Sequence, residues 1–468
     1  MLKRLREIAA LEETTPGTER SGTYAAANAK FLVIDPQYTA DVPMFERDIV
    51  RNTLTPLQKL PGIKFARLTF GIELAGHALG TPDLPPWDRF MKACGFRSKS
   101  ISKITIGAIT NGPFRHGETL TQATSGATAK VVHDTYSGTT TLFVSDITGT
   151  PNNVNIWTGG STAATATPST VATDDGQGWW PITFPTQIAG YSGASIVVGD
   201  VVKGATSLVY GIVREVGASI TLRPYFGAFT NETINEVPSG GSGTTTSITW
   251  LDIPSLTICF NEDGHLRKLI GARGTMSLEA RIGEPPILRF EFMGKVGTPL
   301  DNGMLTGVAY ESKVPATWLN ASARFGHEGD TLTSQEYNPR MSAFTMNMNN
   351  ELSMRKSVNE STGLIECMIT GRGITGSIDP EMDLENAFPF FQDFLDGDVW
   401  RFRTFFGTVA ANKFLLTLSG IQTQGMPSGD REGISTHEIS YEASGGYQTN
   451  VTDTPGSEND CVLTYHLS

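Results

Sequence analysis

The sequence is poor in cysteine and in positive charge, and each shortage argues against a class of protein. Its 468 residues include four cysteines, none in a C-x-x-C pair, so we expect neither a zinc ribbon nor a thiol redox motif. Lysine and arginine number 36 against 48 acidic residues, which gives a formal net charge of −12. Because phosphate neutralisation needs clustered basic residues, we expect a surface that faces DNA to repel it rather than bind it.

Long apolar runs are also missing. No stretch of 18 apolar residues occurs, so no membrane anchoring is expected. Residues 1–17 are basic at their start, but charged residues from Arg6 onward interrupt the apolar run that a signal peptide needs. We predict a short amphipathic helix there, ending near Thr15 and Pro16. The thiols are expected to be free and mostly buried, in a protein made in a reducing cytoplasm: Cys94, Cys259, Cys367 and Cys461.

No spacing typical of a catalytic or metal site is present. The histidines form neither an H-x-x-x-H pair nor a Cys/His cluster, and no G-x-S-x-G elbow occurs. Their positions are His77, His116, His133, His265, His327, His437 and His466. We therefore expect that the protein is not an enzyme, that it has no catalytic, cofactor-binding or metal-binding residues, and that it uses no cofactor.

Two short motifs need a separate interpretation. Gly371–Gly376 matches G-x-G-x-x-G, but Pro380 follows where a dinucleotide-binding motif requires a helix, so we predict a tight turn between strands. A group of acidic residues lacks the glycine of a calcium loop, and we expect it to precede a helix and favour its positive end. These residues are Asp379, Glu381, Asp383 and Glu385.

Glycine and proline are abundant, at 50 and 25 residues, which favours many short strands joined by turns. In Phe65–Ala75 every second residue is apolar, which predicts a half-buried strand, and Lys30–Ile34 is expected to be another strand. Proline at 85 and 86 predicts the start of a short helix that ends before Gly95. Its apolar face is formed by Trp87, Phe90, Met91 and Cys94.

Residues 251–468 resemble residues 1–104 in texture, and we interpret the two segments as one discontinuous domain. Strands are predicted at Ser255–Phe260, Gly274–Ala280, Leu288–Met293, Trp400–Phe406 and Lys413–Ser419. A helix is predicted over Asn386–Asp396, capped by Asn386 and ended by Gly397. Its aromatic stripe is expected in the core and comprises Phe388, Phe391 and Leu395, with Phe390 and Phe394 beside it.

Residues 105–250 differ from both flanks and contain a repeat. Phe114–Ser125 and Val197–Ser207 share a glycine, an acidic residue, alternating apolar residues and Ala-Thr-Ser, and weaker copies occur near Val154–Ile156 and Phe229–Ile234. The four copies, of roughly 30–40 residues each, form two pairs. We predict an inserted all-β module, a small barrel or sandwich, that is one domain or two subdomains at about 105–172 and 188–250. A turn-rich linker with two tryptophans, Asp174–Pro181, is expected between the pairs.

Several short motifs in the flanking segments follow one another in a recognisable order. In the first segment they are Glu13–Thr18, Ala27–Ala29, Pro85–Trp87 and Ala93–Phe96. In the last segment they are Pro254–Ile258, Asp263-Gly264, Gly271–Gly274, Gly283–Pro286, Phe290–Gly294, Gly371-Arg372, Ile378–Pro380 and Asp430–Gly433. In this order they resemble the major tail proteins, or tail tube proteins, of long-tailed bacteriophages (siphoviruses). The insertion at 105–250 is a departure from that pattern.

The resemblance implies a structural virion protein with a β-sandwich fold that forms homohexameric rings. The rings would stack into a hollow tube through which viral DNA passes into the host without sequence-specific binding. It implies contacts with further copies of the chain and with the tape measure, terminator and distal tail proteins. The protein would be made in the bacterial host cytoplasm and reside in the virion tail. The inserted module is expected outside the ring wall, where a long insertion is tolerated.

Two other hypotheses stay open at the level of the sequence. A carbohydrate-binding or adhesion protein of the virion surface would act through the repeats and needs exposed aromatic residues. Trp157, Trp179 and Trp180 are the candidates, and burial is the alternative for each of them. An enzyme such as a depolymerase needs two carboxylates at catalytic spacing, and no such pair can be identified.

Overall fold

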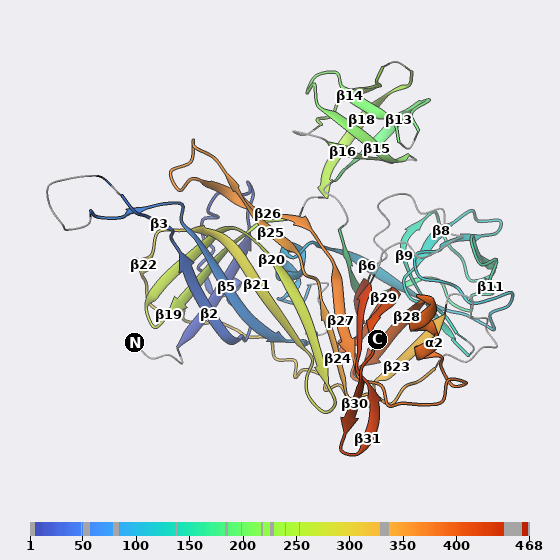
Figure 1. Cartoon of the computed structure of the whole chain (residues 1–468). Coiled ribbons are helices and arrows are strands. Elements are labelled where there is room, and N and C mark those ends of the chain that lie inside the picture. The colour runs from blue at the N-terminus through green and yellow to red at the C-terminus, as the bar shows by residue number, and fades with distance from the viewer. Residues whose placement is uncertain are drawn as a thin grey trace.

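The computed structural model describes residues 5–47, 49, 57–77, 84–136, 138–182, 186–197, 199–216, 219–224, 229–238, 240–251, 253–327, 337–443 and 461–466. Strands make up 52% of the structure and helices 4%. The prediction of a mainly β protein with a few short helices is therefore confirmed. Figure 1 shows the strands of the two flanking segments packed together, with one inserted module beside them and another standing apart.

The first half-domain is a set of six paired strands. They are β1 (Arg6–Glu12), β2 (Ile34–Asp41), β5 (Phe65–Glu73), β19 (Leu256–Glu262), β20 (His265–Arg281) and β21 (Ile287–Val296). They pair in the order β2–β5–β21–β20–β19–β1. A hairpin of β3 (Met44–Phe45) and β4 (Leu60–Pro61) separates β2 from β5, and helix α1 (Asp88–Ala93) follows β5.

The second half-domain repeats this arrangement. Its strands are β23 (Ser322–His327), β24 (Ala343–Asn347), β27 (Ile374–Ile378), β28 (Val399–Phe406), β29 (Lys413–Gly425) and β32 (Ile439–Ala443). They pair in the order β24–β27–β32–β29–β28–β23. A hairpin of β25 (Glu351–Lys356) and β26 (Leu364–Gly371) separates β24 from β27, and helix α2 (Phe390–Asp396) follows β27. The two half-domains correspond in the order of their strands along the chain and in the sheet. They also correspond in the positions of the hairpin and the helix. The domain is therefore an internal duplication.

The two half-domains are joined edge to edge. Residues Ser277–Arg281 of β20 pair with Ala343–Asn347 of β24. One sheet therefore runs through both half-domains in the order β2–β5–β21–β20–β24–β27–β32–β29. The hairpin of β30 (Ser428–Arg431) and β31 (Ile434–His437) extends β29 and β32 and projects at the bottom of Figure 1. In the first half-domain, the short strand β22 (Leu300–Asp301) pairs with the start of β20, and the 3₁₀ turn Ala26–Asn28 contacts β1.

Strict alternation along β5 places one of its faces in the core, as predicted. Ala66, Leu68, Phe70, Ile72 and Leu74 are all buried. The expected helical face of α1, from Trp87 to Cys94, is buried as well, and Gly95 ends that helix with a φ of +86°. The ring of Phe90 lies 5.0 Å from that of Phe70 and 5.5 Å from that of Phe290, so the helix closes the apolar side of the sheet.

The helix predicted at the N-terminus is wrong, because residues 6–12 form strand β1. Its central residues are buried on both faces: Ile8 and Ala10 lie in the main core, and Ala9 packs near Cys259 on the other side. Because β1 is covered on both faces, its consecutive apolar residues imitate the apolar side of an amphipathic helix. The strand expected at Lys30–Ile34 is also shifted, since β2 begins at Ile34.

The helix at 390–396 is shorter than predicted and faces a different way. Pro389 rather than Asn386 precedes its first residue, and Gly397 ends it in the left-handed conformation as expected. Phe388 and Phe390 are buried against Phe325. Phe391 and Leu395, however, are 51% and 60% exposed, so the predicted buried stripe is wrong. The shorter helix turns the stripe toward solvent.

The first inserted module contains five strands that share a small apolar core. They are β7 (Thr119–Gln122), β8 (Thr128–Val131), β9 (Thr141–Thr148), β10 (Trp157–Gly159) and β11 (Thr165–Ala166). Two strands of the main domain, β6 (Phe96–Thr105) and β12 (Thr173–Pro181), lead into it and out of it. The pairing order is β6–β9–β8–β7–β10–β11.

The second inserted module is a closed barrel with a core of its own. Its strands are β13 (Thr186–Ala194), β14 (Val201–Gly204), β15 (Tyr210–Val216), β16 (Ser219–Pro224), β17 (Thr233–Glu236) and β18 (Ser242–Leu251). They pair in the order β13–β16–β15–β14–β17–β18, and β18 closes onto β13. The two modules therefore have the same strand order.

The sequence repeat has the same hydrogen bonds in both modules. The amide of Gly117 donates to Val131 O at 2.8 Å, and that of Gly199 donates to Val213 O at 2.9 Å. Further along, the amides of Gln122 and Gly204 each donate at 2.8 Å, to Ala127 O and Val209 O. The repeated residues thus form one hairpin that occurs once in each module.

The segment between the modules is a core strand and not the predicted linker. Strand β12 pairs with β6 on one side and with the C-terminal strand β33 (Cys461–His466) on the other. The side chains of Trp179 and Trp180 are buried. Two glycines and an aspartate pair signalled a turn in the sequence, but burial of both indole rings outweighs that local preference.

Candidate functional surface

The sheet that runs through both half-domains has one apolar and one polar face. On the apolar face, Phe292, Met276, Met346 and Tyr441 are buried in the core. The polar face follows from cross-strand pairing: Gln37, Thr69, Glu291 and Thr275 stand in one row of paired residues. Further rows contain Arg289, Ser277, Asn347, Thr375, Glu442 and Gln422, and Glu73, Glu279, Thr345, Ser377 and Ser440.

The polar face carries an excess of negative charge. Its solvent-accessible cations are Arg67, Arg281 and Arg289, and its carboxylates are Asp41, Glu73, Glu279, Glu291 and Glu442, while Arg273 and Lys295 on the same face are buried. Three positive and five negative accessible groups give a net charge of −2. Arg67 pairs with Glu291 at 3.0 Å and Arg289 with Glu279 at 3.1 Å. The accessible charge of this broad, polar β surface is therefore mainly carboxylate.

A buried polar joint fixes the first module to the second half-domain. The carboxylate of Asp134, which follows β8, forms an ion pair with Arg401 of β28 and accepts a bond from the amide of His116 at 2.6 Å. The Arg401 guanidinium holds the pKa of Asp134 well below its usual range despite the opposing effect of burial. His133 lies between the hydroxyls of Thr417 and Thr464, at 2.9 and 2.8 Å.

Acid is expected to loosen this joint. Burial, together with the nearby His466 and His116, holds the pKa of His133 well below its usual value, so the folded protein keeps the ring neutral. Below a pH of ~6.5 the unfolded chain takes up a proton that the folded chain does not, and stability falls as the pH falls. We expect the Tm to drop between pH 7.5 and pH 5.5, and the drop to be smaller in a His133→Gln variant. An unchanged pH dependence in that variant would contradict this assignment.

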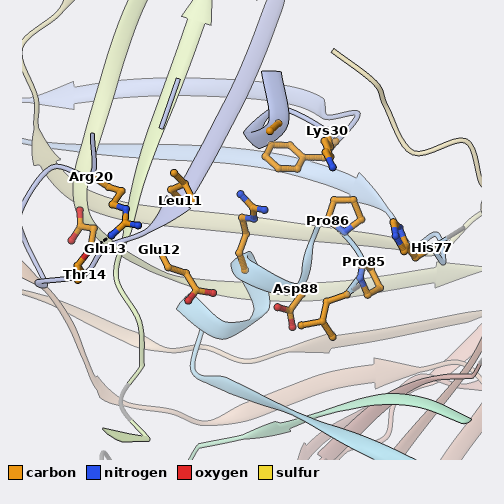
Figure 2. Close-up of a pocket in the computed structure, with 14 residues that line it drawn as sticks. Leu11, Glu12, Glu13, Thr14, Arg20, Lys30, His77, Pro85, Pro86 and Asp88 are labelled. Carbon is orange, nitrogen blue, oxygen red and sulfur yellow. Dashed lines mark hydrogen bonds between the residues drawn. The ribbon is translucent and has the colours of Figure 1, made fainter. Parts of the chain in front are cut away.

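A cavity of about 660 Å³ lies between β1, α1 and the segment before the helix. Figure 2 shows its charged side chains spread around the rim instead of converging on one point. Two of them are engaged locally: Glu13 accepts bonds from Gly271 N at 2.7 Å and Ser255 Oγ at 2.6 Å, and His77 meets Glu311 at 2.6 Å. These contacts tie β1 and the helix to the sheet, and they assemble no nucleophile with a base.

The motifs singled out in the sequence have structural roles. Gly371–Gly376 spans the turn between β26 and β27, as predicted. Of the acidic group, Asp379 and Glu381 both bind Arg431 at 3.1 Å and so fasten the β30–β31 hairpin, which differs from the expected role at a helix start. Within the described part of the chain, no group of three His, Cys, Asp or Glu residues is placed to hold a metal ion.

The three tryptophans proposed for sugar binding are not available at the surface. Trp157 and Trp179 are completely buried and Trp180 is 5% exposed. The four cysteines are buried, and burial raises the pKa of Cys259 to about 12 and that of Cys367 to about 11. These thiols are therefore protonated and unreactive near neutral pH.

Comparison with known proteins adds no assignment. No protein-family model and no curated protein matches the sequence. Among the described residues, no helix is long and apolar enough to cross a membrane.

Proposed function

We propose that the chain is a subunit of a bacteriophage tail tube and that the polar face of the continuous sheet lines its lumen. The observation that carries the proposal is this face, which is broad, polar and net negative. A carboxylate-rich wall repels phosphate, so DNA passes along it without sticking. The ordered family-like motifs in the flanking segments support the same function.

The β3–β4 hairpin supplies a contact between subunits in this proposal. It extends away from the sheet at the left of Figure 1 and carries Met44, Phe45 and Leu60, which are 57%, 61% and 51% exposed. Apolar side chains on a projecting arm have no core of their own to enter, and burial against another copy would remove them from water. The inserted modules lie beside and above the sheet, where they decorate the outer wall.

Electron microscopy tests the proposal. The purified chain is expected to form rings or tubes in negative stain, with the modules visible as external knobs. A Phe45→Asp variant is expected to shorten or abolish tubes, because it places a charge in the inter-subunit contact, while its Tm stays within about 1 °C of the parent because the residue is exposed. A parent chain that stays monomeric at every concentration tried would refute the proposal.

A further inference from the structure

The continuous sheet ends in two open edges. Among the described residues, β2 pairs only with β5, and β30, which extends β29, pairs only with β31. An open edge presents unpaired backbone groups and is a template for another strand. The hairpin that carries β30 is held in place by the two bonds from Arg431 to Asp379 and Glu381.

The chain already contains one junction between such edges. Where β20 meets β24, Glu279 lies opposite Thr345. The pairing is continued at its two ends, by the amide of Met348 donating to Met276 O at 3.0 Å and that of Ile282 donating to Ser342 O at 2.9 Å. This junction links the first half-domain to the second within one molecule.

The duplication identifies the counterparts of these residues. The register shifts after Ala272 on β19 and after Ile421 on β28 in the same way, and both side chains are buried in the main core, so the two residues are equivalent. Strand β29 has one extra residue, Gln424, at the shift between Thr423 and Gly425. Ser277, five residues after Ala272, therefore corresponds to Pro427, six residues after Ile421. The stretch 427–431, which contains β30, is therefore the counterpart of Ser277–Arg281.

The partner strand follows from the cross-strand rows. Thr345 shares a row with Ser377, Ser440 and Gly425. Because of the extra residue in β29, Gly425 lies four residues after Ile421 and is the counterpart of Thr275, three residues after Ala272. The row of Thr275 contains Glu291, Thr69 and Gln37. Gln37 of β2 is thus the counterpart of Thr345, and Gly429 of β30 is that of Glu279.

We propose that β2 of one molecule pairs with β30 of the next, with Gln37 opposite Gly429, and that three molecules close one ring. The inference rests on the proposed tube function, which supplies the expectation of six repeated units in a ring. Because each chain contains two units, three chains provide all six, in place of the six chains expected from the resemblance. The eight strands of each chain then give a closed sheet of 24.

The edge of β2 is protected against indiscriminate pairing. Pro36 has no backbone N–H, and its carbonyl oxygen already accepts a bond from Arg6 at 3.1 Å. The contact between molecules therefore has at least one ladder bond fewer than the junction between β20 and β24. Proline on an edge strand is a common defence against aggregation, so subunits would join only when the rest of the interface also fits.

The mass of the ring tests the number of chains. One chain has a mass of 50.4 kDa, so three give 151.2 kDa and six give 302.4 kDa. Native mass spectrometry of detached rings, or cryo-electron microscopy of tubes formed by the unmodified chain, is expected to show three chains per ring. Rings of six chains would overturn the inference and leave the tube function intact. Absence of any ring or tube would refute the tube function itself.

A cysteine pair tests the junction. The Gln37→Cys/Gly429→Cys variant is expected to form disulfides between molecules in assembled rings, and the covalent series on a non-reducing gel should end at three chains. The native cysteines are buried and do not interfere.

A matched Gln37→Cys/Val358→Cys variant, with its second thiol on the fully exposed Val358 position, should stay uncrosslinked. A Cβ at Gly429 would lie 2.6 Å from Thr436 Oγ1 and from Glu438 Oε1, so these side chains must shift, and a Tm equal to that of the parent will verify folding. Rings that assemble but do not crosslink would overturn the proposed pairing.

Discussion

Replacing Trp179 by alanine is expected to lower the free energy of unfolding by ~3–5 kcal/mol, among the largest effects of any single substitution in this chain. The indole is completely buried, its ring centroid lies 4.5 Å from that of Trp87, and its Nε1 donates to Asp88 Oδ1 at 2.7 Å. Alanine would leave a cavity where β12, between the two modules, joins the main core. Chemical denaturation followed by tryptophan fluorescence and circular dichroism would measure the loss.

A Trp179→Phe variant separates packing from hydrogen bonding. It keeps most of the buried area and removes the bond to Asp88, so we expect a smaller loss of about 1–3 kcal/mol. Val154→Ala, at a side chain that is 73% exposed, should change stability by less than ~0.5 kcal/mol. If Trp179→Ala cost no more than Val154→Ala, the place of β12 in the core would be wrong.

The second large effect is expected from Asp134→Ala. The variant removes the partner of a buried guanidinium, and breaking a buried pair from one side costs about 3–5 kcal/mol because the remaining charge stays out of water. Asp134 and Arg401 are 6% and 9% exposed. Because the pair joins the first module to the second half-domain, hydrogen exchange should increase first in the strands of that module. Thermal unfolding together with exchange mass spectrometry would measure both changes.

Two controls belong to this experiment. Asp134→Leu/Arg401→Met replaces both charges by apolar groups of similar size, and it should recover most of the lost stability. Arg67→Ala removes an exposed ion pair, in which the arginine side chain is 55% exposed, and should cost no more than ~1 kcal/mol. Equal losses in Asp134→Ala and Arg67→Ala would show that the joint contributes no more than a surface contact.

Local patterns predicted the elements that are covered on one side. The alternation in β5 and the helical face around Phe90 each imply one buried face, and that is the face the core receives. The same reasoning failed for β1, because burial on both faces leaves neither period visible. The reasoning also failed for Phe391. Its neighbours form an apolar stripe in the sequence, but the helix is too short to place that stripe in the core.

The larger organisation could be predicted only in part. The repeat between the modules was visible because Ala-Thr-Ser and its flanking glycines survive in both copies. The duplication of the main domain was not, because Thr345 and Gln37, or Glu279 and Gly429, share a position in the sheet without sharing a side chain. What both copies need is a polar residue on one face and an apolar residue on the other, and many sequences meet that need. The buried joint of His133 and Asp134 could not be predicted either. Asp134 and its partner Arg401 are more than 260 residues apart in the sequence, and no local pattern connects them.

The covalent link between the half-domains changes the thermodynamics of any assembly that uses this sheet. Bringing two separate proteins together costs an estimated 4–15 kcal/mol in lost translational and rotational freedom. The junction of β20 with β24 avoids that cost, because its two edges are tethered and meet at a high effective concentration. Tethering also lets the two half-domains diverge, and the inserted modules are present in only one of them. A circular assembly of such chains would alternate between decorated and bare positions around its outside, leaving gaps through which other molecules could reach the wall.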